Sequence, residues 1–70
     1  MPRKIRELKA DLRRAGFNYR AGKGSHTIWF HEIIPNEITL SGNDGDDAKP
    51  YQERLVRNIL HTLNEAQRRN

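Results

Sequence analysis

Hydrophobic residues repeat with a helical period at both ends of this chain and with a strand period between them. Near the N-terminus they recur every three or four residues, so that one side of a helix would carry Ile5, Leu8, Leu12 and Ala15. Gly16 follows at the position where a glycine ends many helices. We therefore expect a first helix that stops just before Gly16.

The centre of the chain alternates apolar and polar residues and is rich in β-branched and aromatic side chains, as strands are. We expect three strands, over residues 17–21, 26–31 and 37–41. Turns are expected at Gly22–Ser25 and at Pro35–Asn36, because glycine, proline and asparagine interrupt regular structure.

A second amphipathic helix is expected from Pro50 onward, since the first helical turn tolerates the missing N–H of proline. Asp46 or Asp47 would cap its start. Its apolar face would carry Tyr51, Leu55, Ile59, Leu60, Leu63 and Ala66, with Val56 at the flank.

The order helix, three strands, helix has short connections, which favour an antiparallel meander. A three-stranded antiparallel sheet can bury the apolar stripes of both helices on one face. We therefore predict a single α+β domain over residues 1–70, with the α-β-β-β-α order of double-stranded-RNA-binding domains.

Composition excludes several classes of protein. The absence of cysteine rules out a disulfide scaffold and a zinc–thiolate site. No apolar run approaches the ~20 residues of a membrane helix, and the N-terminal residues lack the apolar core of a signal peptide. We therefore expect a cytoplasmic protein that associates with no membrane and binds neither a metal nor a cofactor. The acidic residues 43–47 lack the order of a calcium loop.

Charge is unevenly placed along the sequence. Residues 1–31 carry eight Lys or Arg residues and two acidic ones, whereas residues 32–53 carry six acidic residues and one lysine. The basic first part is typical of a surface for nucleic acid. The same charge is also consistent with a solvated surface that keeps the protein in solution.

The stretch Gly22–His26 places an imidazole beside a flexible, cationic turn. Histidine can take and give a proton near neutral pH, which is what cleavage of RNA by its own 2′-hydroxyl requires. Candidate phosphate binders are the turn N–H groups together with Arg20, Lys23, Gly24 and Ser25, and the basic helix face adds Lys4, Lys9, Arg13 and Arg14. Alternatively, His26 only begins a strand and is half-buried.

Strand alternation puts His26 on one face of its strand with Ile28 and Phe30, and Thr27 and Trp29 on the other. We expect Ile28 and Phe30 to face the core. Trp29 would then lie on the uncovered face, where a partner protein would bury it as an anchor.

Several motifs resemble those of the HicA toxins, small bacterial mRNA interferases of type II toxin–antitoxin systems, over nearly the whole chain. The similar segments are Ala15-Gly16-Phe17, Gly24-Ser25-His26 with Thr27-Ile28-Trp29, Ile38-Thr39-Leu40 and Val56-Arg57-Asn58-Ile59-Leu60. The family usually carries a proline and a basic or histidine-containing segment after the third strand. This chain has the acidic residues 43–47 there, which would repel RNA near the site.

The resemblance implies a double-stranded-RNA-binding-like fold and a metal-independent endoribonuclease that acts on mRNA, with His26 as its catalytic residue. It also implies a HicB-like antitoxin that covers the active site, and we expect this partner to be acidic. The alternative function is a non-catalytic RNA-binding or protein-interaction module on the same fold. Direct DNA binding is not expected, because neither helix has helix-turn-helix spacing.

Overall fold

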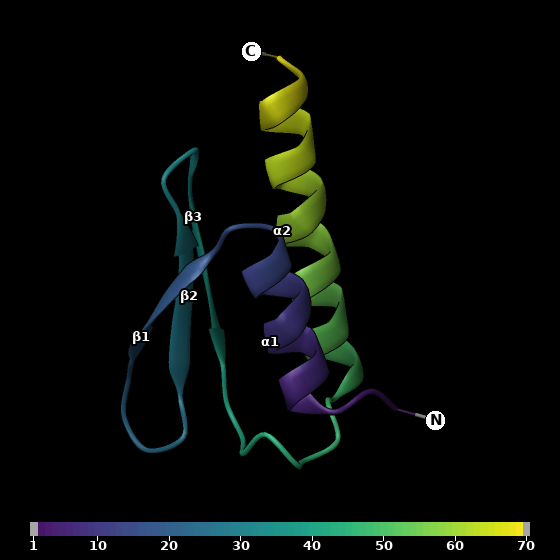
Figure 1. Cartoon of the computed structure of the whole chain (residues 1–70). Coiled ribbons are helices and arrows are strands. Elements are labelled where there is room, and N and C mark those ends of the chain that lie inside the picture. The colour runs from purple at the N-terminus through teal and green to yellow at the C-terminus, as the bar shows by residue number, and fades with distance from the viewer. Residues whose placement is uncertain (1, 70) are drawn as a thin grey trace.

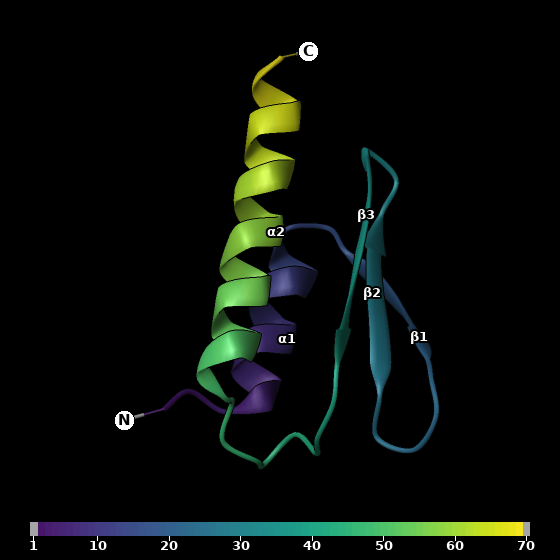
Figure 2. The same ribbon diagram turned by 180° about the vertical axis from the view of Figure 1, so that it is seen from behind.

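Two helices cover one face of a three-stranded sheet in the computed structural model, which describes residues 2–69. Figure 1 shows the sheet and the helices as two layers, and the view from behind in Figure 2 shows that no helix covers the other face of the sheet. The elements are α1 (Ile5–Arg14), β1 (Asn18–Ala21), β2 (Thr27–His31), β3 (Ile34–Leu40) and α2 (Pro50–Arg68). The α+β class and the α-β-β-β-α order are as predicted. Neither helix is long and apolar enough to cross a membrane.

The end of α1 is fixed by Gly16, as the sequence predicts. Gly16 has a φ of +93°, which is the left-handed conformation that glycine adopts without strain. Its N–H donates to the carbonyl of Arg13 at 3.0 Å, and the N–H of Phe17 donates to the carbonyl of Leu12 at 3.0 Å. This pair of bonds is the Schellman motif, and it turns the chain from α1 toward β1.

The sheet is antiparallel in the order β1-β2-β3, so β1 and β3 are both edge strands. The turn between β2 and β3 lies at Glu32 and Ile33, not at Pro35–Asn36 as predicted. Pro35 instead lies within β3, because an edge strand tolerates a residue without an N–H group. In the observed turn, the N–H of Ile33 donates to His31 Nδ1 at 3.1 Å.

The buried face of α2 is rotated away from the predicted stripe. Val56, Ile59 and Leu63 are buried, as is the polar Gln52, whereas Tyr51 and Leu55 are exposed. Leu55 instead lines a groove between α2 and the free edge of β3. Apolar residues occur on two sides of α2, so the sequence did not show which side faces the core.

Gln52, and not Asp46 or Asp47, organises the start of α2. Its Oε1 accepts the N–H of Lys49 at 2.8 Å, and its amide nitrogen donates to the carbonyl of Ser41 at 3.0 Å. These bonds compensate the burial of a polar side chain and tie the helix to the end of β3. The prediction of an aspartate cap at Asp46 or Asp47 is therefore wrong.

Trp29 lies in the core, so the predicted faces of β2 are reversed. Its side chain is completely buried, and its Nε1–H donates to Thr27 Oγ1 at 2.9 Å. Ile28 and Phe30 consequently lie on the face that no helix covers. Every residue of β2 is apolar or amphipathic, so strand alternation alone did not determine which face is buried. A side chain with no exposed surface cannot contact a partner protein. The prediction that Trp29 anchors a partner is therefore wrong.

The central position of Trp29 predicts a large loss of stability on truncation. Trp29→Ala should lower the free energy of unfolding by about 3–5 kcal/mol. A chain of this length has only about 4–10 kcal/mol in total, so the variant should be close to unfolded. Denaturation with urea, followed by circular dichroism, measures the change.

Ile33→Ala is the matched control, because Ile33 is an apolar residue that is 42% exposed in a turn. It should change the free energy of unfolding by no more than about 0.5 kcal/mol. Equal effects of the two substitutions would show that Trp29 is not a core residue.

Candidate functional site

The β1–β2 turn forms a tight, cationic tip. The N–H of Gly22 donates to the carbonyl of His26 at 2.9 Å, and the N–H of His26 donates to the carbonyl of Lys23 at 3.0 Å. Gly24 has a φ of +58° at the first central position of this turn, where glycine is favoured. Within residues 2–69, the N–H groups of Lys23, Gly24 and Ser25 donate no hydrogen bond, so all three are available to an anion.

His26 is exposed and immediately precedes β2, where its carbonyl accepts the N–H of Gly22 and so continues the pairing with β1. The alternation of β2 places it on the uncovered face of the sheet, with Ile28 and Phe30. A Cβ atom on Gly22 would lie only 3.2 Å from the Cβ of His26, so the glycine leaves room for this side chain. Among residues 2–69, no side chain forms a hydrogen bond with the imidazole.

Arg20 is the cation nearest to His26 in the strand pairing. It pairs with Ile28, which makes it a diagonal neighbour of His26 on the same face, with Cα atoms about 7–8 Å apart. Its guanidinium lies 5.4 Å from the centre of the Phe30 ring and forms an ion pair with Glu37 at 3.1 Å. Both charged groups are about half exposed, so this ion pair is weak and exchangeable.

The loop after β3, which carries the acidic residues 43–47, begins beside this tip. Ser25 Oγ accepts the N–H of Gly42 at 3.0 Å. The loop then packs against the first turns of α1, where Asp47 binds Lys4 at 2.5 Å and Asp44 binds Lys9 at 2.6 Å. Two of its aspartates are thus paired with Lys4, which precedes α1, and with Lys9 of α1, and these pairs offset part of the repulsion expected from this loop.

These ion pairs shift the pKa values of the carboxylates. The hydrogen bond from Lys9 holds the pKa of Asp44 below its usual value. In the same way, the hydrogen bond from Arg3 lowers the pKa of Asp11 on α1 and raises that of Arg3. Asp44 is therefore ionised at neutral pH and competes with any phosphate for Lys9.

The predicted phosphate binders fall into two groups. Lys9 and Arg20 are each paired with a carboxylate, and the side chain of Lys9 is only 13% exposed. Lys23 and Arg13 have no carboxylate within 4.0 Å in the described part of the chain. Lys23 lies in the turn beside His26, whereas the guanidinium of Arg20 is directed along β2 toward Phe30 and Glu37. Lys9 and Arg13 lie on the side of the sheet that faces α1.

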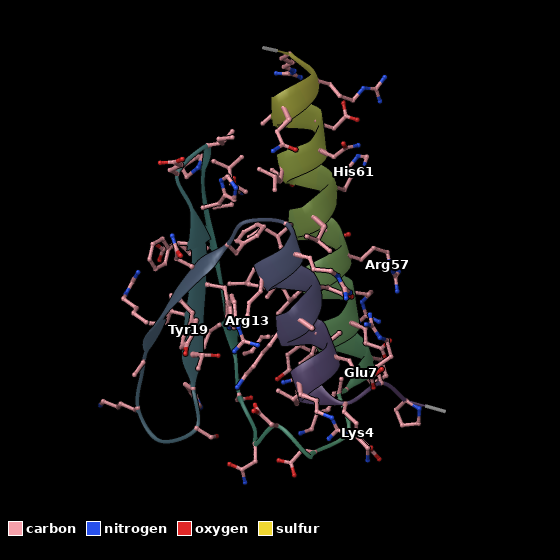
Figure 3. The ribbon with its side chains drawn as sticks, viewed as in Figure 1. Lys4, Glu7, Arg13, Tyr19, Arg57 and His61 are labelled. Carbon is pink, nitrogen blue, oxygen red and sulfur yellow. The ribbon has the colours of Figure 1, made fainter. Side chains whose placement is uncertain are left out.

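The other two histidines lie away from His26. His31 is at the opposite end of β2, five residues and therefore about 17 Å further on. It is half-buried with its ring 5.1 Å from that of Phe17. His61 is exposed on α2, as Figure 3 shows. The site thus offers one imidazole, and residues 2–69 contain no cluster of three or more histidine or acidic side chains suited to a metal ion.

The sequence reasoning missed an aromatic pair on the α1 side of the sheet. Tyr19 stacks on Trp29 with ring centres 4.8 Å apart, and the guanidinium of Arg13 lies near both rings. In Figure 3, Tyr19 and Arg13 lie next to each other between β1 and α1. The length of the β1–β2 turn could have revealed this pair in the sequence, because it determines the register that places Tyr19 opposite Trp29.

A comparison with protein families supports the motifs seen in the sequence. The model of the family described as the HicA toxin of bacterial toxin–antitoxin systems matches residues 5–65, from the start of α1 into the last turns of α2. No curated protein and no solved structure gives a significant match. Because the family model covers most of the 70 residues, the chain belongs to the HicA toxin family.

Proposed function

We propose that this toxin is an endoribonuclease that cleaves mRNA, with His26 as its proton-transfer residue. The observation that carries the proposal is the hairpin tip, where an exposed imidazole adjoins a lysine and three N–H groups without hydrogen-bond partners. An anion bound at this tip would lie beside the imidazole. That is the arrangement needed for proton transfer at a phosphodiester.

The proposed reaction uses the 2′-hydroxyl of the RNA as its nucleophile. The 2′-oxygen attacks the adjacent phosphorus, and the bond from phosphorus to the 5′-oxygen of the next nucleotide breaks. The products are a 2′,3′-cyclic phosphate and a 5′-hydroxyl, and no other reactant is consumed. His26 accepts the proton of the 2′-hydroxyl and supplies one to the leaving oxygen, because imidazole titrates near neutral pH.

Cations and N–H groups around His26 would stabilise the charge that develops on the phosphate. Lys23 and the N–H groups of Gly24 and Ser25 are the nearest donors along the chain. Arg20 can join them by exchanging Glu37 for a phosphate, since an exposed ion pair is worth only about 0–1 kcal/mol. Lys9 and Arg13 extend the positive surface on the α1 side and would position RNA without reading its sequence.

Membership of this family implies an antitoxin partner. We propose a HicB-like antitoxin that covers the hairpin tip and excludes RNA from His26. Carboxylates of an acidic antitoxin would complement Lys23 and the turn N–H groups and speed association. This contact replaces the one expected at Trp29.

His26→Ala should abolish RNA cleavage and relieve growth arrest, while leaving the fold intact. We expect a loss of at least about 100-fold in cleavage rate, which is typical when a general acid or base is removed. The free energy of unfolding should change by no more than about 0.5 kcal/mol, because the side chain is exposed. Cleavage is measured on purified protein with EDTA present.

His61→Ala is the matched control, because His61 is also exposed but lies on α2. It should cleave like the wild-type chain. If His26→Ala cleaves equally well, or if wild type is inactive without metal, the mechanism is wrong. RNA binding by wild type without any cleavage would favour the non-catalytic RNA-binding module.

Asp44→Asn should strengthen RNA binding, because it releases Lys9 from its ion pair. In a His26→Ala background, we expect affinity to rise several-fold at low salt. The slope of log affinity against log salt concentration should steepen by up to about one, as for one additional phosphate contact. Titration of a single-stranded RNA at several salt concentrations measures both quantities.

Glu65→Gln removes the same charge and releases Arg68 from an ion pair near the C-terminal end of α2. It should change the affinity and the slope much less. Equal effects of the two substitutions would mean that only net charge matters and that Lys9 is not on the RNA path.

A further inference from the structure

Tyr19 presents one face of its ring to solvent at the edge of the sheet. It lies on β1, the edge strand, and is 52% exposed. Its inner face stacks on Trp29 of the neighbouring strand, with an angle of 30° between the rings. No strand follows beyond β1, so the outer face of the ring points past the edge of the sheet.

Arg13 does not cover this outer face. Its guanidinium carbon is 5.7 Å from the centre of the Tyr19 ring and 5.6 Å from that of Trp29, while the two centres are 4.8 Å apart. A guanidinium on the outer face would be several ångströms farther from Trp29 than from Tyr19. The near-equal distances place it beside the stack, with no carboxylate within 4.0 Å in the described chain.

We propose that Tyr19 and Arg13 form a nucleobase site, in which one unpaired base of the RNA stacks on the outer face of Tyr19 and Arg13 contacts its phosphate. The proposal rests on the proposed function and extends it to the class of substrate. An aromatic ring fixed from behind by a buried tryptophan is ordered before binding, so little conformational entropy is lost. The adjacent cation supplies the electrostatic attraction that single-stranded nucleic acids require.

Tyr19 lies where one strand of RNA could contact both its ring and His26. Tyr19 is four residues from Lys23, which is about 13 Å along an extended strand. All four residues of β1 are exposed, and Arg20 lies on the opposite face of the same strand. An RNA chain can therefore cross the open edge of β1, from Tyr19 on one face to Arg20 and the hairpin tip. A base in a duplex has no free face, so the substrate must be single-stranded at this point.

The test measures binding of a short single-stranded RNA to the non-cleaving His26→Ala chain. Tyr19→Leu keeps an apolar cover over Trp29 but removes the aromatic face, and should weaken binding by roughly 5- to 100-fold. Tyr19→Phe should bind within about twofold of its parent. The salt dependence should stay unchanged in Tyr19→Leu, because stacking releases no counterions. Tyr51→Leu, at an exposed tyrosine on α2, is the control without effect.

A second arm leaves Tyr19 intact and uses RNAs with an abasic nucleotide at successive positions. One abasic position should weaken binding to the parent as much as Tyr19→Leu does, and should have no further effect in that variant. Fluorescence of Trp29, the only tryptophan, should change when intact RNA binds and much less when the abasic RNA binds.

The outcomes separate the two proposals. Unchanged affinity in Tyr19→Leu, or equal losses at every abasic position, would overturn the nucleobase site while leaving RNA cleavage at His26 in place. Equal affinity for duplex and single-stranded RNA would also overturn it. If the parent chain binds no RNA at all, the proposed function fails and the nucleobase site fails with it.

Discussion

Burial of Trp29 is the constraint on which the rest of this small domain depends. Successive residues of a strand point to opposite faces, so placing Trp29 in the core determines the face of every other side chain on β2. It puts His26 on the uncovered face, and through the strand pairing it puts Arg20 there as well. It also draws Tyr19 onto the α1 side, next to Arg13. Both proposed RNA contacts therefore follow from the packing of one side chain.

The acidic loop is the second feature that gives this chain its particular surface. Its residues are far from α1 in the sequence, yet Asp44 and Asp47 bind Lys9 and Lys4. The loop also accepts the first N–H groups of α1, since Ile5 donates to the carbonyl of Asp46 at 2.9 Å. An acidic segment beside a proposed RNA site is thus partly neutralised by the helix that it stabilises. In the proposed function, the loop would weaken RNA binding because Asp44 occupies Lys9.

The sequence predicted the order of elements well because each helix and strand carries its own period, and Gly16 and Gly24 have the conformations that their turns require. It predicted the wrong buried face for β2. Every residue of this strand is apolar or amphipathic, so the alternation of side chains did not show which face lies in the core. Pro35 suggested a turn, although an edge strand accepts it. The ion pair of Lys9 with Asp44 joins residues that are 35 positions apart in the sequence, and no local sequence pattern predicts such a contact.

The proposed site could be read from the sequence only where its residues are close together along the chain. The turn, the imidazole and Lys23 lie within five residues of one another, whereas the pairing of Tyr19 with Trp29 required the hairpin register. The most direct test of His26-dependent cleavage is to identify the product ends in EDTA, for one RNA and for a copy with a 2′-deoxynucleotide at the cleaved position. We predict a 2′,3′-cyclic phosphate and a 5′-hydroxyl from the first, and no cleavage there of the second. A 5′-phosphate product, or equal cleavage of both RNAs, would contradict the proposed chemistry.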